Sequence, residues 1–460
     1  MTGSGERPRI TVIGIGHPPL GDPAAARLAE ATLIVGARRH LTAARLDPPS
    51  PARPGLMPVG ATPPGPTASG PTASGPTTSG PTGPLHPLPG GTTPGRRIVE
   101  LTGDLEPALA ALAAADGPSV VLASGDPGFF GVVRVLAERF GRHRLEVLPS
   151  VSSVAGAFAA AGLPWDDALV VTAHGRDPDP AVHACLAHPK VAVLTRPGFG
   201  PAELAARLAG SGRRLLVAER LGEPDQRVVE GDPAGIEARR WADPNVVLVL
   251  DERRAVPLGK GGAWPARRAP ARWALQEAAF EHRDGMITKS EVRALALARL
   301  GPGVGDLVWD VGAGSGSVGV ECARLGAAVI AVDRDPLACK LVTTNAERHG
   351  VVVRVVDGAA PAALDALPDP DAVFVGGGGG ALEAILRLVA VRARRAVVVA
   401  LSGAGAHARP DRVLLAARSL AAAGMDVETA LLQASRFETT TGLSESLAIN
   451  PVYLVSGARP

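Results

Sequence analysis

The chain has 460 residues, about three times the length of a typical domain, so two or three domains are expected. Hydrophobic residues make up 46% of the sequence and charged residues 20%, which is ordinary for a globular protein and excludes a largely disordered chain. The 47 basic and 45 acidic residues leave a net charge of +2, which provides no general attraction for nucleic acid or an anionic membrane.

The cysteines and the apolar runs exclude further classes. Cys185, Cys322 and Cys339 show neither CxxC nor Cys/His spacing, so we expect no disulfide framework and no metal site. No uncharged apolar run reaches the length of a membrane span, and residues 1–10 contain no apolar signal core. We therefore expect a cytoplasmic protein in a reducing compartment.

Residues 48–95 form a low-complexity segment. It is dominated by Pro, Gly, Ser and Thr and contains the near-repeat GPTASGPTASGPTTSGPTG. This composition cannot bury apolar surface, so we expect the segment to be disordered. Only about 40 structured residues precede it, which is marginal for an independent domain. An insertion in a loop of the first domain is therefore favoured over a linker between domains.

Short apolar runs alternate with helical patterns on both sides of this insertion. The first is RITVIGIG, and the later ones are SVVLAS (119–124), RLEVLPS, ALVVTAHG, KVAVLTRPG, RLLVAERLG and NVVLVLDE. Such strands are typical of mostly parallel sheets that helices cover on both faces. The pattern lapses at 251–272, where basic residues stand among Pro and Gly. We interpret 251–272 as a solvated linker in preference to an anion-binding segment, which gives an N-terminal domain at 8–250 and a C-terminal domain at 273–460.

The C-terminal domain contains five further strand-like runs, GDLVWDVG, AAVIAVD, VVVRVVDG, DAVFVGG and RAVVVAL. The helical stretches that alternate with them lie at 336–349, 360–367, 381–391 and 412–423. Two more strand candidates, 427–434 and 452–455, have no long helix between them. This order predicts an open doubly wound sheet with an antiparallel edge.

A glycine-rich loop follows the first strand of this domain. It reads DxGxGxG, with Asp310, Gly312, Gly314 and Gly316, and leads into the helical stretch VGVECARL. Such glycines let the backbone approach a ligand closely and turn into a helix N-terminus. The nicotinamide dinucleotide fingerprint requires Gly where this chain has Ser317, so the loop does not fit that fingerprint.

Two more acids end the following strands. Asp333, about 20 residues further on, lies where a carboxylate can hold both hydroxyls of a ribose, and Asp357, followed by Gly358, offers an edge for an adenine ring. This arrangement resembles the S-adenosylmethionine fold of class I methyltransferases. A cationic sulfonium needs no phosphate cradle, and nearby acids suit it better than they suit a phosphate.

The N-terminal domain offers different loops. Residues 124–131, SGDPGFFG, connect a buried strand to a helix at the edge where open α/β sheets bind ligands. Ser152 and Ser153 either cap the next helix or offer hydroxyls to a ligand, and the sequence leaves both roles open. The opening loop GIGHPP at 14–19 is no dinucleotide loop, because its prolines remove amides that would grip phosphate.

Taken in order, VIGIG, GDPGFFG, PSVSS and AERLGEP resemble the class III tetrapyrrole methyltransferases, a two-lobed α/β family that binds S-adenosylmethionine between its lobes. AHGR and LTRPGFGPAELA resemble the members that methylate carbon 5 of the cobalamin precursor. GMITKSEVRALALARL before WDVGAGSGSVGVE resembles the class I partner family, which methylates carbon 15 and removes a carboxyl from the ring-C acetate. The resemblance implies a two-lobed class III domain followed by a doubly wound, Rossmann-like, seven-stranded class I domain, fused in one enzyme of cobalamin biosynthesis.

This resemblance implies one S-adenosylmethionine per domain, two per chain, and a precorrin-6B-type tetrapyrrole substrate. In the N-terminal domain it implies cofactor contacts at Gly14, Gly16, Gly125, Asp126, Pro127, Ser152 and Ser153. In the C-terminal domain it implies contacts at Thr288, Asp310, Gly312, Gly314, Gly316, Asp333, Asp357, Gly358 and Ala359. Members commonly carry a Pro-Gly pair after the first GIG, where this chain has His17-Pro18-Pro19. A homodimer or homotetramer is expected because relatives of each half commonly self-associate.

The implied chemistry is attack of a nucleophilic ring carbon on the sulfonium methyl, so the protein's main task is positioning. Cations suit a substrate that carries acetates and propionates. The candidates are Arg176, Arg196, Lys289 and Arg436, each of which also fits a solvated surface residue. His174 is a candidate proton donor or acceptor, or a structural histidine. No metal is needed, because the macrocycle itself can accept electrons during decarboxylation.

Two other functions stay open. One is an RNA methyltransferase with an N-terminal specificity domain, and the other is an S-adenosylmethionine-binding scaffold with one degenerate site. The near-zero net charge and the 3% of aromatic residues weigh against RNA, while the GIGHPP loop alone supports the scaffold. The glycine run at 376–380 either makes room for a flat substrate or is a permissive loop.

Overall fold

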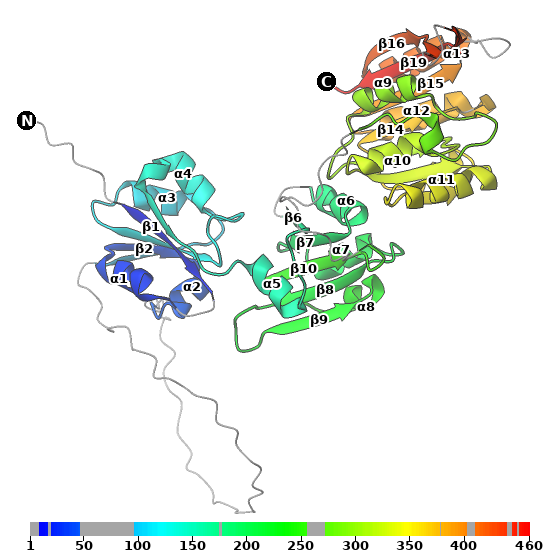
Figure 1. Cartoon of the computed structure of the whole chain (residues 1–460). Coiled ribbons are helices and arrows are strands. Elements are labelled where there is room, and N and C mark those ends of the chain that lie inside the picture. The colour runs from blue at the N-terminus through cyan, green and yellow to red at the C-terminus, as the bar shows by residue number, and fades with distance from the viewer. Residues whose placement is uncertain are drawn as a thin grey trace, which may run out of the picture. The chain divides into compact units, whose positions relative to one another are not determined.

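The computed structural model describes residues 9–16, 20–46, 96–173, 177–254, 272–377, 379–402, 410–438, 444–448 and 450–460. The expected insertion, most of the expected linker, the 17–19 part of the opening loop, His174 and Arg176 lie outside these residues. The chain divides into two compact units, residues 1–153 and 154–460 (Figure 1). The division falls inside the segment 8–250, between the two sheets that this segment contains.

The first unit contains a parallel sheet with helices on both faces. Its strands are β1 (Ile10–Ile15), β2 (Leu33–Gly36), β3 (Arg97–Glu100), β4 (Ser119–Ser124) and β5 (Leu145–Leu148), in the order β3-β2-β4-β1-β5, and all pairings are parallel. The helices are α1 (Asp22–Glu30), α2 (Arg38–Ala43), α3 (Glu106–Ala113), α4 (Val133–Phe140) and the short 3-10 helix η1 (Arg142–Arg144). Val12 packs in one buried cluster with Leu112 of α3, and Ile13 packs in another with Leu28 of α1. The expected parallel sheet with two covered faces is confirmed here.

A mixed sheet opens the second unit, after α5 (Ser153–Ala161). Its strands are β6 (Leu169–Thr172), β7 (Lys190–Leu194), β8 (Arg214–Glu219), β9 (Arg227–Gly231) and β10 (Asn245–Leu250), in the order β6-β7-β10-β8-β9. Only β6 and β7 pair in parallel, so the expectation of a mostly parallel sheet is wrong here. The short connection 220–226 between β8 and β9 is the physical reason for one of these pairings, because parallel neighbours need a longer crossover. The helices are α6 (Asp179–Ala187), α7 (Pro201–Arg207) and α8 (Pro233–Glu237).

The second unit also contains a seven-stranded sheet. Its strands are β11 (Leu307–Val311), β12 (Ala328–Asp333), β13 (Arg354–Asp357), β14 (Ala372–Val375), β15 (Ala396–Ser402), β16 (Asp426–Leu432) and β19 (Val452–Ala458). The order is β13-β12-β11-β14-β15-β19-β16, with β11 to β15 parallel and β19 antiparallel to both of its neighbours. The predicted doubly wound sheet with an antiparallel edge is confirmed.

Helices cover this sheet on both faces (Figure 1). They are α9 (Ser290–Leu300), α10 (Ser317–Arg324), α11 (Pro336–Arg348), α12 (Leu382–Arg392) and α13 (Pro410–Ala422), with the short helices η2 (Glu277–Ala279) and η4 (Gly379–Ala381). The helix expected at 360–367 is only the 3-10 turn η3 (Ala362–Leu364), because Pro361 removes an amide donor at its start and Pro368 and Pro370 prevent it from continuing. The hairpin of β17 (Ser435–Glu438) and β18 (Ser444–Ala448) was not expected, since its sequence does not alternate apolar and polar residues.

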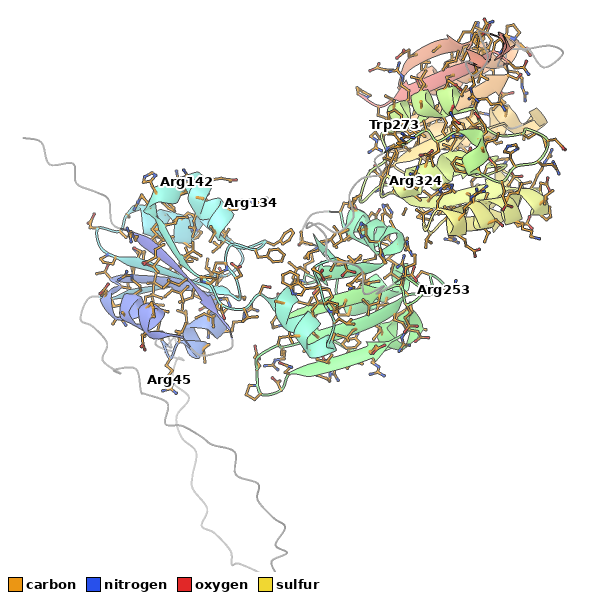
Figure 2. The ribbon with its side chains drawn as sticks, viewed as in Figure 1. Arg45, Arg134, Arg142, Arg253, Trp273 and Arg324 are labelled. Atoms are coloured by element: carbon orange, nitrogen blue, oxygen red, sulfur yellow. The ribbon has the colours of Figure 1, made fainter. Side chains whose placement is uncertain are left out.

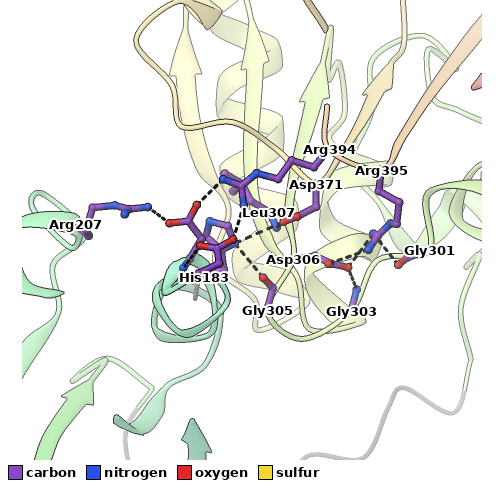
Figure 3. Close-up of polar contacts among 12 residues, drawn as sticks. His183, Arg207, Gly301, Gly303, Gly305, Asp306, Leu307, Asp371, Arg394 and Arg395 are labelled. Atoms are coloured by element: carbon purple, nitrogen blue, oxygen red, sulfur yellow. Dashed lines mark hydrogen bonds and ion pairs between the residues drawn. The ribbon is translucent and has the colours of Figure 1, made fainter. Parts of the chain in front are cut away.

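Within the second unit, α6 packs against the amino-terminal edge of the seven-stranded sheet (Figure 3). His183 is 2% exposed, and its Nδ1 lies 3.0 Å from the Gly305 carbonyl oxygen and 3.6 Å from Asp371 Oδ2. Ala187, one helical turn further on, belongs to the same buried cluster as Leu307 of β11. The helix therefore contributes to the core of a sheet that lies more than 100 residues later in the sequence.

Ionic contacts surround this packing. Asp179, at the start of α6, lies 2.5 Å from Arg394 and 2.5 Å from Arg207. Asp177 lies 3.2 Å from Arg394 on the other guanidinium nitrogen. Each of these ions is partly exposed, so the pairs add orientation and little stability.

Gly305 provides a test of how closely α6 approaches the sheet. Its φ is +93°, and a Cβ there would lie 3.3 Å from Pro180 Cβ. We expect Gly305→Ala to lower the free energy of unfolding of the second unit by about 1–2 kcal/mol, since it combines left-handed strain with crowding. Urea denaturation measures the change.

Gly303→Ala is the matched control, because a Cβ at Gly303 would come no closer than 3.7 Å to another group. It should change the free energy of unfolding by less than about 0.5 kcal/mol. Equal effects of the two substitutions would contradict the close approach of Pro180.

Candidate active sites

The glycine loop of the C-terminal domain joins β11 to α10. Gly312, Gly314 and Gly316 have φ angles of +71°, +56° and +71°. A Cβ at Gly316 would lie 2.8 Å from Val342 of α11, so this position needs glycine for packing as well. A Cβ at Gly314 would meet nothing within 4 Å. The loop thus presents open backbone at the carboxyl edge of the sheet, where such folds bind ligands.

Asp333, the last residue of β12, holds this loop. Its Oδ2 accepts a hydrogen bond of 2.8 Å from the Gly314 amide, and its Oδ1 accepts one of 3.0 Å from the Asp335 amide. A cavity lies beside them, lined by Arg283, Met286, Gly314, Ser315, Asp333, Asp335, Leu337, Ala338 and Leu341. Gly314 and Asp333 therefore share one cavity, whose wall carries a carboxylate fixed by two backbone amides.

Asp310 lies beneath the loop and is not part of the cavity lining. The residue is 1% exposed, and its Oδ2 accepts a hydrogen bond of 2.8 Å from the Gly319 amide of α10. Burial raises the pKa of Asp310 to about 7. This hydrogen bond joins β11 to α10 and so stabilises the two elements that flank the glycine loop.

The end of β13 lies next to Asp333. Asp357 pairs in register with Asp333, and the Gly358 amide donates to the Asp333 carbonyl at 2.9 Å. Asp357, Gly358 and Ala359 thus lie at the same sheet edge as the cavity but outside its lining. Their contact with an adenine ring stays a prediction.

We refer to residues 272–289 as the strap. At its start, the Arg272 carbonyl accepts a hydrogen bond of 3.1 Å from the side chain of Arg324 on α10. Figure 2 labels Arg324. Further along, the fully buried amide of Asn345 bonds the Glu281 backbone at 2.7 and 2.8 Å and donates to the Ser315 carbonyl at 2.8 Å. One side chain of α11 thereby connects the strap to the glycine loop.

A buried ion pair holds both ends of the strap. Arg293 and Glu321 are fully buried and 3.6 Å apart. Arg293 donates to the Thr288 carbonyl at 2.5 Å and also to the Leu275 carbonyl, while Glu321 accepts from the Leu275 amide at 2.7 Å. Thr288, a predicted cofactor contact, is therefore fixed through its backbone just before α9.

Sequence reasoning did not single out Arg283, Met286 or Asn345. The strap carries Arg283 and Met286 onto the cavity, and Arg283 lies 3.3 Å from Asp335 Oδ2. The sequence could have pointed to Met286 and Arg283, because Met286 belongs to the motif GMITKSEVRALALARL and Arg283 lies just before it. Nothing comparable marks Asn345, which is one of several polar residues in the helical stretch 336–349.

The structure describes three of the predicted substrate-binding cations. Arg436 bonds the carboxylates of Glu277 and Glu291 at 2.7–2.9 Å, and this pairing lowers the pKa of Glu277 to about 2. Lys289 and Arg196 contact only backbone carbonyls, each at 3.4 Å, within the described part of the chain. The charge of Arg436 is therefore already matched by protein carboxylates, whereas those of Lys289 and Arg196 are not.

Three loops of the N-terminal domain meet at the carboxyl edge of the first sheet. A Cβ at Gly14 would lie 2.0 Å from the Gly125 oxygen and 2.5 Å from the Ser150 nitrogen, so only glycine permits this approach. The Ser150 amide donates to the Gly125 carbonyl at 3.2 Å, and a Cβ at Gly125 would lie 3.3 Å from the Ser153 nitrogen. The predicted segments 14–16, 125–127 and 152–153 are thus brought together.

The loop after β4 is tightly turned. Asp126 Oδ1 accepts a hydrogen bond of 2.8 Å from the Gly128 amide, and a Cβ at Gly131 would lie 2.3 Å from the Pro127 oxygen. Phe130, the second of two consecutive aromatic residues in this loop, has a φ of +53° and is 52% exposed. Asp126 and Pro127 therefore shape a compact loop directly beside Gly125.

Comparison with known proteins assigns both halves. The family described as "Tetrapyrrole (Corrin/Porphyrin) Methylases" matches residues 10–236, and the "Precorrin methyltransferase domain" matches residues 278–446. A Sinorhizobium protein named "Precorrin-6Y C(5,15)-methyltransferase [decarboxylating]" is 36% identical over 398 residues, which cover 82% of this chain and 81% of that protein. The chain belongs to the family of precorrin-6Y C(5,15)-methyltransferases (decarboxylating). The two fold families expected from the sequence motifs are thereby confirmed.

Shorter relatives of this family match parts of the chain. A "Probable cobalt-precorrin-6B C(15)-methyltransferase (decarboxylating)" of Pyrobaculum calidifontis is 38% identical over 38% of this chain and 91% of its own length. A "Cobalt-precorrin-7 C(5)-methyltransferase" of Salmonella typhimurium is 35% identical over 29% of this chain and 66% of its own length. Each of these relatives is named for one of the two methylated positions.

The described residues lack two further features. None of their helices is both long and apolar enough to cross a membrane. No group of three or more His, Cys, Asp and Glu side chains among them is arranged to hold a metal ion.

Asp310 gives a pH-dependent prediction. Its pKa is about 7 in the folded chain, against 3.8 for an ordinary aspartate, so the folded state holds a proton that the unfolded state has released between these pH values. Stability should therefore fall as the pH rises from about 4 to about 7 and then level off. In Asp310→Asn this contribution disappears, so the free energy of unfolding of the wild type relative to the variant should drop by about 3 kcal/mol between pH 5 and 8.

Asp357→Asn is the control for urea denaturation at these pH values, because Asp357 ends β13 of the same sheet and is exposed. Its stability difference from the wild type should not change in this way. Parallel wild-type and Asp310→Asn curves would contradict a buried, proton-binding Asp310.

Proposed function

We propose that the chain methylates a precorrin macrocycle at carbons 5 and 15 and removes the carboxyl of the ring-C acetate, as a step of cobalamin biosynthesis. The observation that carries this proposal is that predicted cofactor residues come together at a sheet edge on each of two different folds. One is the cavity with Gly314 and Asp333, and the other is the meeting of the loops at Gly14, Gly125 and Ser150. The family membership supports the same two reactions.

The C-terminal cavity fits S-adenosylmethionine, which when bound supplies an electrophilic methyl group on a sulfonium. The open backbone at Gly314 leaves room for the methionine part, and Asp333 offers a fixed carboxylate for the ribose hydroxyls. Thr288, Gly312 and Gly316 complete this cradle, with Asp357, Gly358 and Ala359 toward the adenine. A second cofactor, bound by Gly14, Gly16, Gly125, Asp126, Pro127, Ser152 and Ser153, makes two per chain.

The protein's contribution to both transfers is positioning, because the ring carbon is itself the nucleophile. In the C-terminal site, Asn345 fixes the strap and the glycine loop relative to each other. A Cβ at Gly376, at the end of β14, would lie 2.9 Å from the Gly312 oxygen, and Gly377 has open space beside it. This side-chain-free surface suits a flat, bulky substrate such as a tetrapyrrole.

The direct test is mass spectrometry of the product formed from precorrin-6B and S-adenosylmethionine. We expect the gain of two methyl groups and the loss of one carbon dioxide. Calorimetric titration should give two S-adenosylmethionine molecules per chain. An unchanged substrate mass would refute the proposed reactions, and a stoichiometry of one would refute the second cofactor site.

Paired substitutions separate the two reactions. Asp333→Ala removes the acceptor of the Gly314 amide and should weaken the C-terminal cofactor site about 10- to 100-fold, which stops methylation at carbon 15 and spares carbon 5. Asp126→Ala removes the acceptor of the Gly128 amide and should have the opposite selectivity. Each variant serves as the control for the other, and loss of both methylations in either one would contradict separate sites.

A further inference from the structure

We propose that Arg39 binds a peripheral carboxylate of the macrocycle during the methylation at carbon 5. This inference rests on the proposed function. It adds a carboxylate-binding residue to the N-terminal domain, where the sequence motifs offered Arg176 and Arg196 as candidate cations.

Arg39 is held at the carboxyl edge of the first sheet. It lies on α2, and its Nη2 donates to Ser124 Oγ at 2.9 Å, while its Nε donates to His40 Nε2 at 3.2 Å. Ser124 is the last residue of β4 and directly precedes Gly125. The guanidinium is therefore fixed beside the loop that forms the predicted cofactor edge.

Neutral groups hold this guanidinium. Ser124 is uncharged, and His40 is only 8% exposed. Burial, and to a smaller extent the charge of Arg39, lowers the pKa of His40 to about 4, so the imidazole is neutral at physiological pH. His40 Nε2 also lies 2.8 Å from Ser124 Oγ, which closes a compact triangle of three side chains.

The neighbouring residue, Arg38, shows the contrast. Arg38 bonds both oxygens of Glu100 at 3.0 and 2.9 Å, so its charge is matched by the protein. No carboxylate among the residues that the structure describes pairs with Arg39. Two consecutive arginines on one helix therefore differ in that one charge is neutralised and the other is available.

The remaining donors of Arg39 suit a carboxylate. A guanidinium has five N–H groups, and the two observed bonds use one on Nε and one on Nη2. The Nη1 and Nη2 end stays open for a two-pronged contact with a carboxylate. Because the side chain is already ordered, little further conformational entropy is lost when the ligand binds. The acetates and propionates of the macrocycle provide such carboxylates.

The test uses the full chain in an Asp333→Ala background, which confines methylation to carbon 5. Arg39→Ala should raise the KM for the macrocycle about 10- to 100-fold and leave kcat within about threefold. The macrocycle's Kd for the S-adenosylhomocysteine-loaded protein should rise by the same factor, and this rise should shrink at high salt. Arg39→Lys keeps the charge without the fork and should lie in between. If the alanine variant fails to fold, Arg39→Gln serves in its place.

Arg38→Ala is the matched control and should bind the macrocycle like the parent protein. Unchanged macrocycle binding in Arg39→Ala would overturn the inference. So would an equal loss in Arg38→Ala, or a loss confined to S-adenosylmethionine affinity, which would assign the contact to the methionine carboxylate. Full affinity in Arg39→Lys would overturn the two-pronged contact. Absence of methylation at carbon 5 in the parent protein would instead refute the proposed function, while the binding measurement would still judge Arg39.

Discussion

The buried amide of Asn345 is the interaction on which the C-terminal site depends most directly. It uses its carbonyl and its amino group to bond the strap at Glu281 and the glycine loop at Ser315. Without that amide, backbone groups on both segments would lose their partners, and the loss at buried Ser315 alone would cost about 1–3 kcal/mol. The two walls of the cavity therefore form together, although they come from different parts of the sequence.

The two predicted cofactor edges are built by different means. The C-terminal edge depends on buried polar side chains, including the Arg293–Glu321 pair, whose cost of burial is offset by hydrogen bonds to the backbone of Leu275 and Thr288. The N-terminal edge depends on direct backbone contact between Gly14 and Gly125, where a single methyl group would not fit. Hydrogen bonds of buried side chains thus hold the C-terminal edge together, whereas the lack of side chains at Gly14 and Gly125 allows the N-terminal loops to meet.

The sequence predicted those parts of the fold and site that depend on local patterns. Apolar runs with glycine or acidic ends identified β11, β12 and the residues Gly314 and Asp333, because a strand end places such residues at the ligand edge. The antiparallel pairings of β10 were not predictable, since an apolar strand has the same sequence pattern in either direction. Hydrogen bonds between residues that are distant in sequence could not be predicted either. Asn345 bonds a residue 64 positions away, and Arg436 bonds Glu277 across 159 positions, so neither environment could be read from neighbouring residues.

The position of α6 has a consequence for how this two-domain chain can change over evolution. The helix contacts Gly305 and Asp371, at the amino ends of β11 and β14, whereas the glycine loop leaves the carboxyl end of β11. This packed surface therefore joins α6 to the seven-stranded sheet within the second unit. Substitutions of His183 or Ala187 would disturb the core of the seven-stranded sheet as well as the helix itself, so both elements constrain how these positions can change.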